Sequence, residues 1–252
     1  MRRWDNAVRA DGELGSSVGR VAVANAEQHD KKTYKECPMI HAIEADPRIA
    51  DSLLPKVPTV HGFPPALFRI HNIGMYSEDG EMDFGLDSNV GGELGSLQPG
   101  SRRRGPRRNA QNVKRVKTMT YDSFAARHGI RHASWVKVDA EGFDPYILHG
   151  MEGSLRARAI VGLQFEYSNL WELKNRTHTL RHAVDFLYEL GYHTYYAGRT
   201  LLMPLWGSHW REPYGQPGGW TDMVAVQKHS SFERFFVRQF SPGPPCAPNT
   251  AL

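Results

Sequence analysis

Hydrophobic and polar positions follow two kinds of pattern along the chain, and their order predicts strands that alternate with helices. Period-2 alternation or short apolar runs, typical of strands, mark Ile40–Ala45, Phe68–Met75, the segment that begins at Trp135, Ile160–Phe165, Tyr192–Tyr196 and Asp222–Gln227, with further regular structure at Val113–Met119. Apolar residues at helical spacing mark Val18–Ala26, a segment that begins at Pro47, Tyr121–His128, Tyr146–Met151 and Leu180–Leu190. This order predicts a mostly parallel sheet covered by helices on both faces.

Three further segments interrupt or end this pattern. Met82, Phe84 and Leu86 alternate behind a turn signal at residues 77–80, which predicts a hairpin with the preceding strand. Residues 87–112 lack periodicity and carry five arginines, so we expect an extended mobile loop. The proline-rich tail from Ser241 is expected to be disordered.

Length and composition set broad limits on the class of protein. The 252 residues suit one large domain, and the net charge of +4 is mild. Cys37 and Cys246 are too far apart in sequence to indicate a disulfide framework or a metal site. There is neither an apolar segment that could cross a bilayer nor an apolar signal core at the start, so the expectation is a soluble intracellular, cytoplasmic protein.

Carboxylates at the ends of predicted strands are the main candidates for chemistry. Glu44, Asp139 and Glu166 each close a strand, and parallel sheets bind ligands at such ends. Residues two apart in a strand share a face, so Lys137, Asp139 and Glu141 are expected to point at one place. The structural alternatives are that Lys137 neutralises the acids, or that Glu166 is a solvated rim acid. A divalent cation held by the carboxylates is a weaker alternative.

A glycine turn precedes these strands. Glu13, Gly15, Ser17 and Gly19 form a Gly-x-x-x-Gly segment in which the backbone could pass close to a ligand. A plain helix start explains the same residues. Glu44 lies at a strand end about 25 to 30 residues later, where such folds hold ribose hydroxyls, although it could instead cap the next helix.

Three other features of the sequence bear on binding or catalysis. The arginine run at residues 102–108 could contact phosphates nonspecifically, but it has no aromatic interleaving, so base-specific nucleic-acid recognition is not supported. Trp206, Trp210, Tyr214 and Trp220 could cover a substrate cleft, and packing is the favoured explanation. The histidines pair with neither a serine nor a cysteine nucleophile, so a hydrolytic triad is unsupported.

Several blocks in a fixed order resemble the FkbM family of S-adenosylmethionine-dependent methyltransferases over roughly residues 13–228. Residues 136–150 are similar to the family's Lys-Ile-Asp-Val-Glu-Gly signature and the Leu-x-Gly helix that follows it. Residues 40–47 resemble the second-strand block, residues 72–80 an Asn-x-Ala-Leu-Ser block, and residues 116–124 a Thr-Leu-Asp block.

The resemblance implies a Rossmann-like class I α/β fold with a seven-stranded, mostly parallel sheet whose last strand is antiparallel. It divides the chain into an extension at residues 1–12, a domain at 13–228 with an arginine-rich insertion at about 88–112, and a tail at 229–252. The reaction implied is O-methylation of a hydroxyl on a small molecule or sugar, with S-adenosylmethionine as the donor.

The resemblance also assigns roles to individual residues. The set implied for the cofactor is Glu13, Gly15, Ser17, Gly19, Glu44, Asn72 and Asp139, and the set implied for catalysis is Asp139, Glu141 and Glu166. Glu13, Ser17 and Ala45 depart from the family's usual Asp, Asn and Pro. Two alternatives therefore stay open, a catalytically degenerate interaction protein and an RNA methyltransferase that uses the arginine loop.

Overall fold

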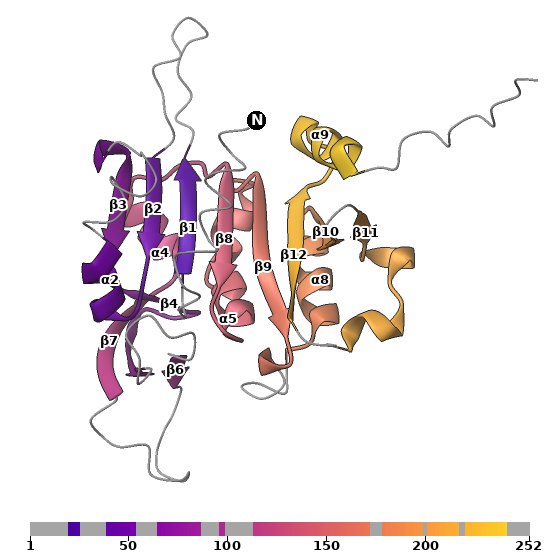
Figure 1. The fold of residues 1–252 in the computed structure, drawn as a ribbon. Helices are drawn as coiled ribbons and strands as arrows, with labels where there is room; N and C mark the ends of the chain where they lie inside the picture. The colour runs from indigo at the N-terminus through magenta and orange to yellow at the C-terminus, as the bar shows by residue number, and fades with distance from the viewer. Residues whose placement is uncertain are drawn as a thin grey trace, which may run out of the picture.

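The larger of two sheets organises the molecule. The structure, a computed structural model, describes residues 20–25, 39–53, 65–86, 96–98, 113–171, 178–198, 201–216 and 220–240. Eight strands follow one another in the order β11-β10-β12-β9-β8-β1-β2-β3 (Figure 1). Their bounds are β1 Arg20–Asn25, β2 Met39–Ile43, β3 Phe68–His71, β8 Trp135–Asp139, β9 Gly162–Ser168, β10 Tyr192–Ala197, β11 Leu202–Pro204 and β12 Trp220–Gln227.

The sheet is mixed, which corrects the prediction of a seven-stranded, mostly parallel sheet. Strands β2, β3, β8, β9 and β10 share one direction, whereas β1, β11 and β12 run against it. The β3-β2-β1-β8-β9 order still matches the outward 3-2-1-4-5 order of doubly wound folds, whose ligands bind at the carboxyl ends of the strands. The predicted antiparallel final strand is confirmed, because β12 pairs antiparallel with β9.

The predicted helix at Val18–Ala26 is wrong where the structure describes it, because residues 20–25 form β1. The sequence Arg-Val-Ala-Val-Ala-Asn alternates with a period of two, and β-branched valines favour strands. β1 pairs antiparallel with both neighbours, so that Val21 lies opposite Ile43 on one side and Val138 on the other. Its first residue, Arg20, is therefore at the same edge of the sheet as the carboxyl end of β8.

A smaller sheet lies beside that edge and revises two predictions. Its order is β4-β7-β5-β6 (Figure 1), with β4 at Gly74–Met75, β5 at Gly80–Gly85, β6 at Ser96–Gln98 and β7 at Val113–Met119. The predicted strand at residues 68–75 is divided between the two sheets, and the break falls at Asn72, where the alternation slips. The predicted hairpin is also wrong, since β5 pairs with β6 and β7 rather than with the strand before it.

Helices α4, α5 and α8 lie behind the larger sheet in Figure 1, and α9 lies in front of its upper end. Thr120 accepts a hydrogen bond from Ser123 N at the start of α4, and Gly129 ends that helix in a left-handed conformation. The helices are α2 Pro47–Leu53, α4 Tyr121–His128, α5 Asp144–His149, α6 Glu152–Arg156, α8 Leu180–Glu189 and α9 Ser231–Phe240, with 3₁₀ turns at Pro65–Leu67, Gly207–His209 and Glu212–Gly215. Within the described residues, every helix is too short or too polar to cross a bilayer.

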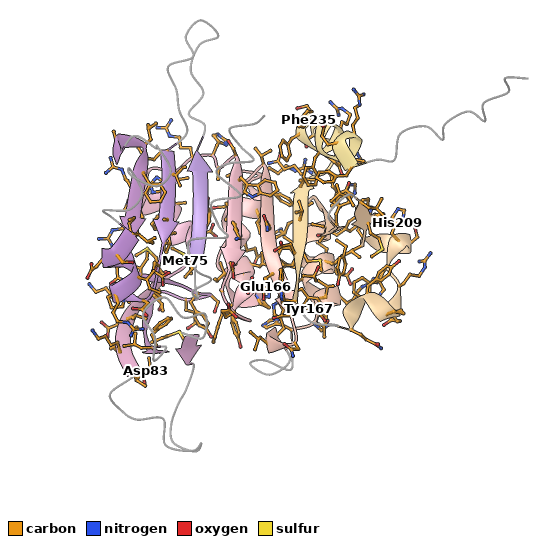
Figure 2. All side chains as sticks on the ribbon, viewed as in Figure 1. Met75, Asp83, Glu166, Tyr167, His209 and Phe235 are labelled. Atoms are coloured by element: carbon orange, nitrogen blue, oxygen red, sulfur yellow. The ribbon has the colours of Figure 1, made fainter. Side chains whose placement is uncertain are left out.

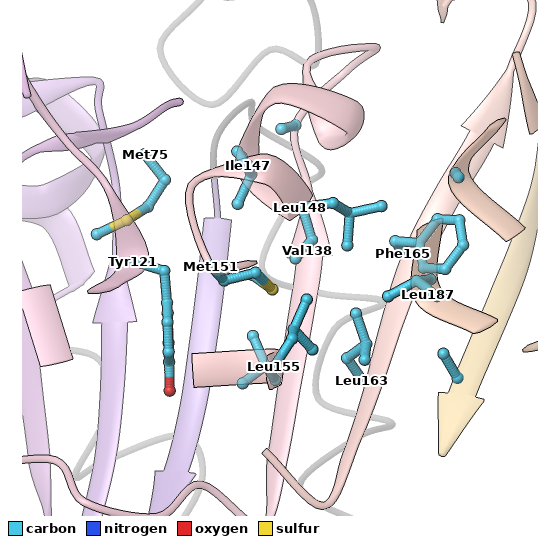
Figure 3. Packing of buried hydrophobic residues seen from close by; sticks show 14 of the residues in the cluster. Met75, Tyr121, Val138, Ile147, Leu148, Met151, Leu155, Leu163, Phe165 and Leu187 are labelled. Atoms are coloured by element: carbon cyan, nitrogen blue, oxygen red, sulfur yellow. The ribbon is translucent and has the colours of Figure 1, made fainter. Parts of the chain in front are cut away.

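The main hydrophobic core fills the space between these rear helices and the sheet. Val138 and Phe165 come from neighbouring strands, Ile147 and Leu187 come from α5 and α8, and Met151 comes from the turn between α5 and α6 (Figure 3). All five are 1% exposed or less. Burying side chains of this size contributes roughly 1.5–3 kcal/mol each, so the core fixes the ends of β8 and β9 firmly.

Helix α9 was not predicted, and it is held to the opposite face of the sheet by apolar packing and by one carboxylate. Glu233 Oε1 accepts a hydrogen bond from Tyr195 and contacts His193 Nδ1, while Oε2 accepts from His229 N. The His193 ring in turn stacks on Trp206, with the ring centroids 3.9 Å apart. This packing confirms the structural explanation for Trp206.

Three histidines pack together between β2, β3 and α4. His41 Nδ1 lies 3.0 Å from His71 Nε2, and the rings of His128 and Phe124 close the cluster. Burial, followed by the nearby charge of His128, lowers the pKa of both His41 and His71 to about 4. The pKa of His128 is also lowered, chiefly by burial, and Arg69 and Arg127 are the cations nearest to it.

Acid is expected to destabilise the protein through this cluster. Since the folded pKa of His41 and His71 lies below the ordinary value of 6.5, the unfolded chain binds more protons between pH 6.5 and 4. The free energy of unfolding should therefore fall as the pH is lowered through this window, by at most about 1.4 kcal/mol per pH unit for each histidine. Urea unfolding between pH 4.5 and 7.5 measures this slope.

His71→Phe should make the slope shallower, because phenylalanine keeps a ring in the cluster but cannot take up a proton. His132→Asn, at an exposed position, is the matched control. Equal slopes in the wild type and His71→Phe would contradict this account.

Candidate functional site

The turn after β8 carries the residues with the strongest sequence signal. Asp139 ends the strand, Glu141 has a φ of 48° and Gly142 has a φ of 91°, and α5 begins at Asp144. A Cβ atom at position 142 would lie 2.8 Å from Leu170 Cβ and 3.0 Å from Leu170 O, so only glycine fits there. The turn is thereby held against the segment that follows β9.

The side chains of the β8 signature do not all share one face. Lys137 and Asp139 alternate as predicted, and Lys137 Nζ lies 3.5 Å from Asp139 Oδ2. This confirms the ion-pair alternative for Lys137. Strand β8 ends at Asp139, and Glu141 lies beyond it with a left-handed backbone conformation. The alternation of a strand therefore does not align Glu141 with Asp139, contrary to the prediction.

The parallel pairing of β8 with β9 brings acids of the two strands together. Val138 lies opposite Phe165, which places Asp139 and Glu166 as the next residues along the two strands. Glu166 lies at the lower end of β9 in Figure 2. Burial, followed by the charge of Asp139, raises the pKa of Glu166 to about 7, and Asp222 raises it further while Lys137 opposes the rise. Because burial is the main cause of this rise, the interpretation of Glu166 as a solvated acid at the rim of the site is wrong.

Asp144 is a third acid of the site, and sequence reasoning did not select it. Its side chain is fully buried, and Oδ1 accepts a hydrogen bond of 3.0 Å from Glu166 N. Among the described residues, Oδ2 has no hydrogen-bond partner. Burial, followed by the charges of Asp139 and Glu166, raises the pKa of Asp144 well above its usual value. Burial of this kind favours the protonated form of the carboxyl. The position of Asp144 at the start of α5 was the signal available in the sequence.

Glu44 and Asn72 form a second group, at the ends of β2 and β3. Asn72 Nδ2 donates hydrogen bonds to the main-chain oxygens of Glu44 and Ala45, which ties the two strand ends together. Glu44 is 1% exposed, and its Oε1 accepts a hydrogen bond of 2.8 Å from Asp46 N. Asp46 accepts from Arg48 N and pairs with the Arg48 guanidinium, so Asp46 caps α2, as predicted.

The two groups flank β1 at one edge of the larger sheet. Ile43 and Val138, the residues on either side of Val21, immediately precede Glu44 and Asp139. With strands spaced at about 4.8 Å, the two strand ends are roughly 10 Å apart. Glu13, Gly15, Ser17 and Gly19 lie outside the described residues, as does the arginine run.

The site therefore offers negative charge with little compensation. Asp139, Asp144 and Glu166 interact electrostatically, with Lys137 beside them. Such a cluster favours a positively charged ligand, and a carboxyl with a pKa near 7 can accept a proton at neutral pH. For the divalent-cation alternative, the described residues provide no group of three or more His, Cys, Asp or Glu side chains placed to hold a metal ion.

Comparison with known proteins gives one match. The family model described as the Methyltransferase FkbM domain matches residues 17–194, which include β1, β2, β8 and β9 and the acids Glu44, Asp139, Asp144 and Glu166. No curated protein and no solved structure matches the chain. The family match confirms the resemblance found in the sequence motifs.

Replacing Gly142 should damage the fold of the turn. Gly142→Ala is expected to lower the free energy of unfolding by at least about 2 kcal/mol, because it adds a steric clash to the cost of a positive φ. Gly129→Ala is the matched control, since Gly129 has a φ of 67° with no atom within 4 Å of an added Cβ. It should cost only about 1 kcal/mol. Equal losses in urea unfolding would show that Leu170 does not confine the turn.

Proposed function

Because the chain belongs to the FkbM methyltransferase family, we propose that it transfers a methyl group from S-adenosylmethionine to a hydroxyl on a small molecule or sugar. The observation that carries the proposal is the convergence of Asp139, Asp144 and Glu166 at the carboxyl ends of β8 and β9. These residues lie inside the matched domain and at the edge where doubly wound sheets bind ligands.

The acids of the site suit a cationic methyl donor. When bound, S-adenosylmethionine supplies a methyl group on a positively charged sulfur. Asp139 would face this charge, because it is partly exposed and its strand end points into the acidic cluster. Asp144, which is fully buried, would hold the main chain of Glu166 in place rather than contact the donor.

The ends of β2 and β3 would hold the nucleoside part of the donor. Glu44 occupies the strand-end position that binds ribose hydroxyls in related folds, and Asn72 would lie on the adenine side. Glu44 Oε1 also accepts a hydrogen bond from Asp46 N. The Glu44 carboxylate would therefore bind both the turn and the ribose. Glu13, Gly15, Ser17 and Gly19 are proposed to cradle the donor.

Glu166 is the proposed base for the acceptor hydroxyl, and Glu141 is the second candidate. The bound donor would supply the methyl group and keep the electron pair of the carbon–sulfur bond, while the acceptor hydroxyl oxygen would take the methyl group. The hydroxyl proton passes to the Glu166 carboxylate. A carboxylate with a pKa of about 7 is better matched to this task than one with an ordinary pKa. Asp139 would orient the hydroxyl for in-line attack.

Substitution of the two strand-end acids tests donor binding. Asp139→Asn and Glu44→Gln should each weaken the affinity for S-adenosylmethionine at least about tenfold, because each removes a charge or a paired hydrogen bond worth roughly 1.4 kcal/mol. Isothermal titration calorimetry measures the dissociation constants. Asp51→Asn and Glu189→Gln, at exposed positions on α2 and α8, are the matched controls.

Unchanged affinity in both site variants would contradict the proposal. Absence of binding in the wild type would favour the degenerate interaction protein.

The pH dependence of donor binding tests the part played by Glu166. As the pH rises through about 7, Glu166 loses its proton and adds a negative charge beside the sulfonium, so the donor affinity should increase. Glu166→Gln should remove this component of the pH dependence. Calorimetry at pH 6, 7 and 8 on the wild type, Glu166→Gln and Glu189→Gln measures it. Identical pH profiles for all three proteins would exclude Glu166 from the donor pocket.

A further inference from the structure

The front face of β9 and β12 is apolar where α9 covers Val224 and Val226, and it carries polar residues further along the two strands. In the antiparallel register of the two strands, Asp222 lies directly opposite Glu166 and Trp220 lies directly opposite Ser168. Side chains alternate along a strand, so these four share the face that Phe165 does not use. None of them except Glu166 has a role in the methyl transfer proposed above.

Asp222 and Glu166 form an unfavourable pair of like charges. Residues directly opposite one another on antiparallel strands have Cβ atoms about 5 Å apart, where like charges destabilise a sheet. The charge of Asp222 contributes to the raised pKa of Glu166. Among the described residues, neither carboxylate has an ion-pair partner within 4.0 Å, and the salt bridge of Lys137 goes to Asp139. A cation placed between Glu166 and Asp222 would relieve the repulsion.

Ser168 presents a buried hydroxyl to the same place. Its side chain is 3% exposed, and its Oγ has no hydrogen-bond partner of good geometry among the described residues. The hydroxyl nevertheless lies close enough to Glu166 to lower the pKa of that carboxyl. A buried polar atom without a partner is costly, so this oxygen indicates a missing donor group next to the acids.

Trp220 supplies an aromatic surface beside the acids. It is 73% exposed, whereas Trp206 packs on His193 and Trp210 is 8% exposed. The packing explanation of the tryptophan-rich segment therefore holds for Trp206 and Trp210 but not for Trp220. An indole face attracts organic cations, and acids with an exposed tryptophan are a recurring combination for alkylammonium groups.

We propose that this face, defined by Ser168, Glu166, Asp222 and Trp220, binds an ammonium group carried by the methyl acceptor. The inference rests on the proposed function and specifies its substrate class as a hydroxyl compound that also bears an amine. The ammonium lies between Glu166 and Asp222 and donates to Ser168 Oγ, while its carbon substituents contact Trp220. β12 lies two strands from β8, so that the Asp222 strand lies roughly 10 Å from the Asp139 strand, which leaves Asp139 to the donor. With Glu166 paired to the ammonium, Glu141, the second candidate for the base, takes the hydroxyl proton.

The test uses ethylammonium chloride as the probe and compares it with sodium chloride at the same ionic strength. For the wild type, ethylammonium should raise the melting temperature saturably, by roughly 2–4 °C near saturation, because it binds only the folded state. Asp222→Asn should raise the melting temperature without any probe, since it removes the repulsion with Glu166, and it should abolish the response to ethylammonium. Trp220→Leu should reduce the response severalfold.

Asp51→Asn is the control and should respond as the wild type does. A response to ethylammonium no larger than that to sodium, or an unchanged response in Asp222→Asn, would overturn the inference. Donor binding, measured by calorimetry on the same proteins, separates the two proposals. If S-adenosylmethionine binds but ethylammonium gives no response, only the proposed acceptor class is wrong. If ethylammonium gives a response but S-adenosylmethionine does not bind, only the proposed methyl transfer is wrong.

Discussion

The hydrogen bond from the Glu166 main chain to the buried Asp144 carboxyl connects the two halves of the site. It joins the start of α5 to the end of β9, and the parallel register of β8 and β9 then places Asp139 beside Glu166. An ionised carboxylate at the position of Asp144 would repel Asp139 and Glu166, and burial, which raises the pKa of Asp144, disfavours that ionised form. The positions of the other acids depend on this contact.

Concentrating acids at one sheet edge opposes stability, and the hydrophobic core offsets it. Val138 and Phe165, the residues just before the two strand-end acids, are almost completely buried under α5 and α8. Such packing leaves the strand ends little freedom to move apart and relieve the repulsion. Electrostatic strain held by a rigid scaffold is a common property of ligand sites, because the ligand supplies the compensating charge.

Local patterns in the sequence predicted most elements and the chemical character of the site. The helix at Tyr121–His128, the strand that ends at Asp139 and the acid that follows β2 all follow from spacing and residue type. Glu166 was predicted to follow a strand that ends at Phe165, but it lies inside β9, which continues to Ser168. Features that depend on pairing between distant segments could not be predicted. The direction of β1, the placement of β7 between β4 and β5, and the contact of Asp144 with Glu166 N are all set by tertiary packing. Asp222 was missed for the same reason, since only the β9–β12 register brings it to Glu166.

Strand β12 has a consequence for how the domain can be divided. The family match ends at residue 194, yet β12, at residues 220–227, fills the gap between β9 and β10 in the middle of the larger sheet. A protein cut at the family boundary would end inside β10, lose β12 and leave the ladder of β9 with unpaired backbone groups open to solvent. Exposed strand edges of that kind promote intermolecular pairing. The smallest unit expected to fold independently is thus set by the closure of the sheet and extends past the region of recognisable homology.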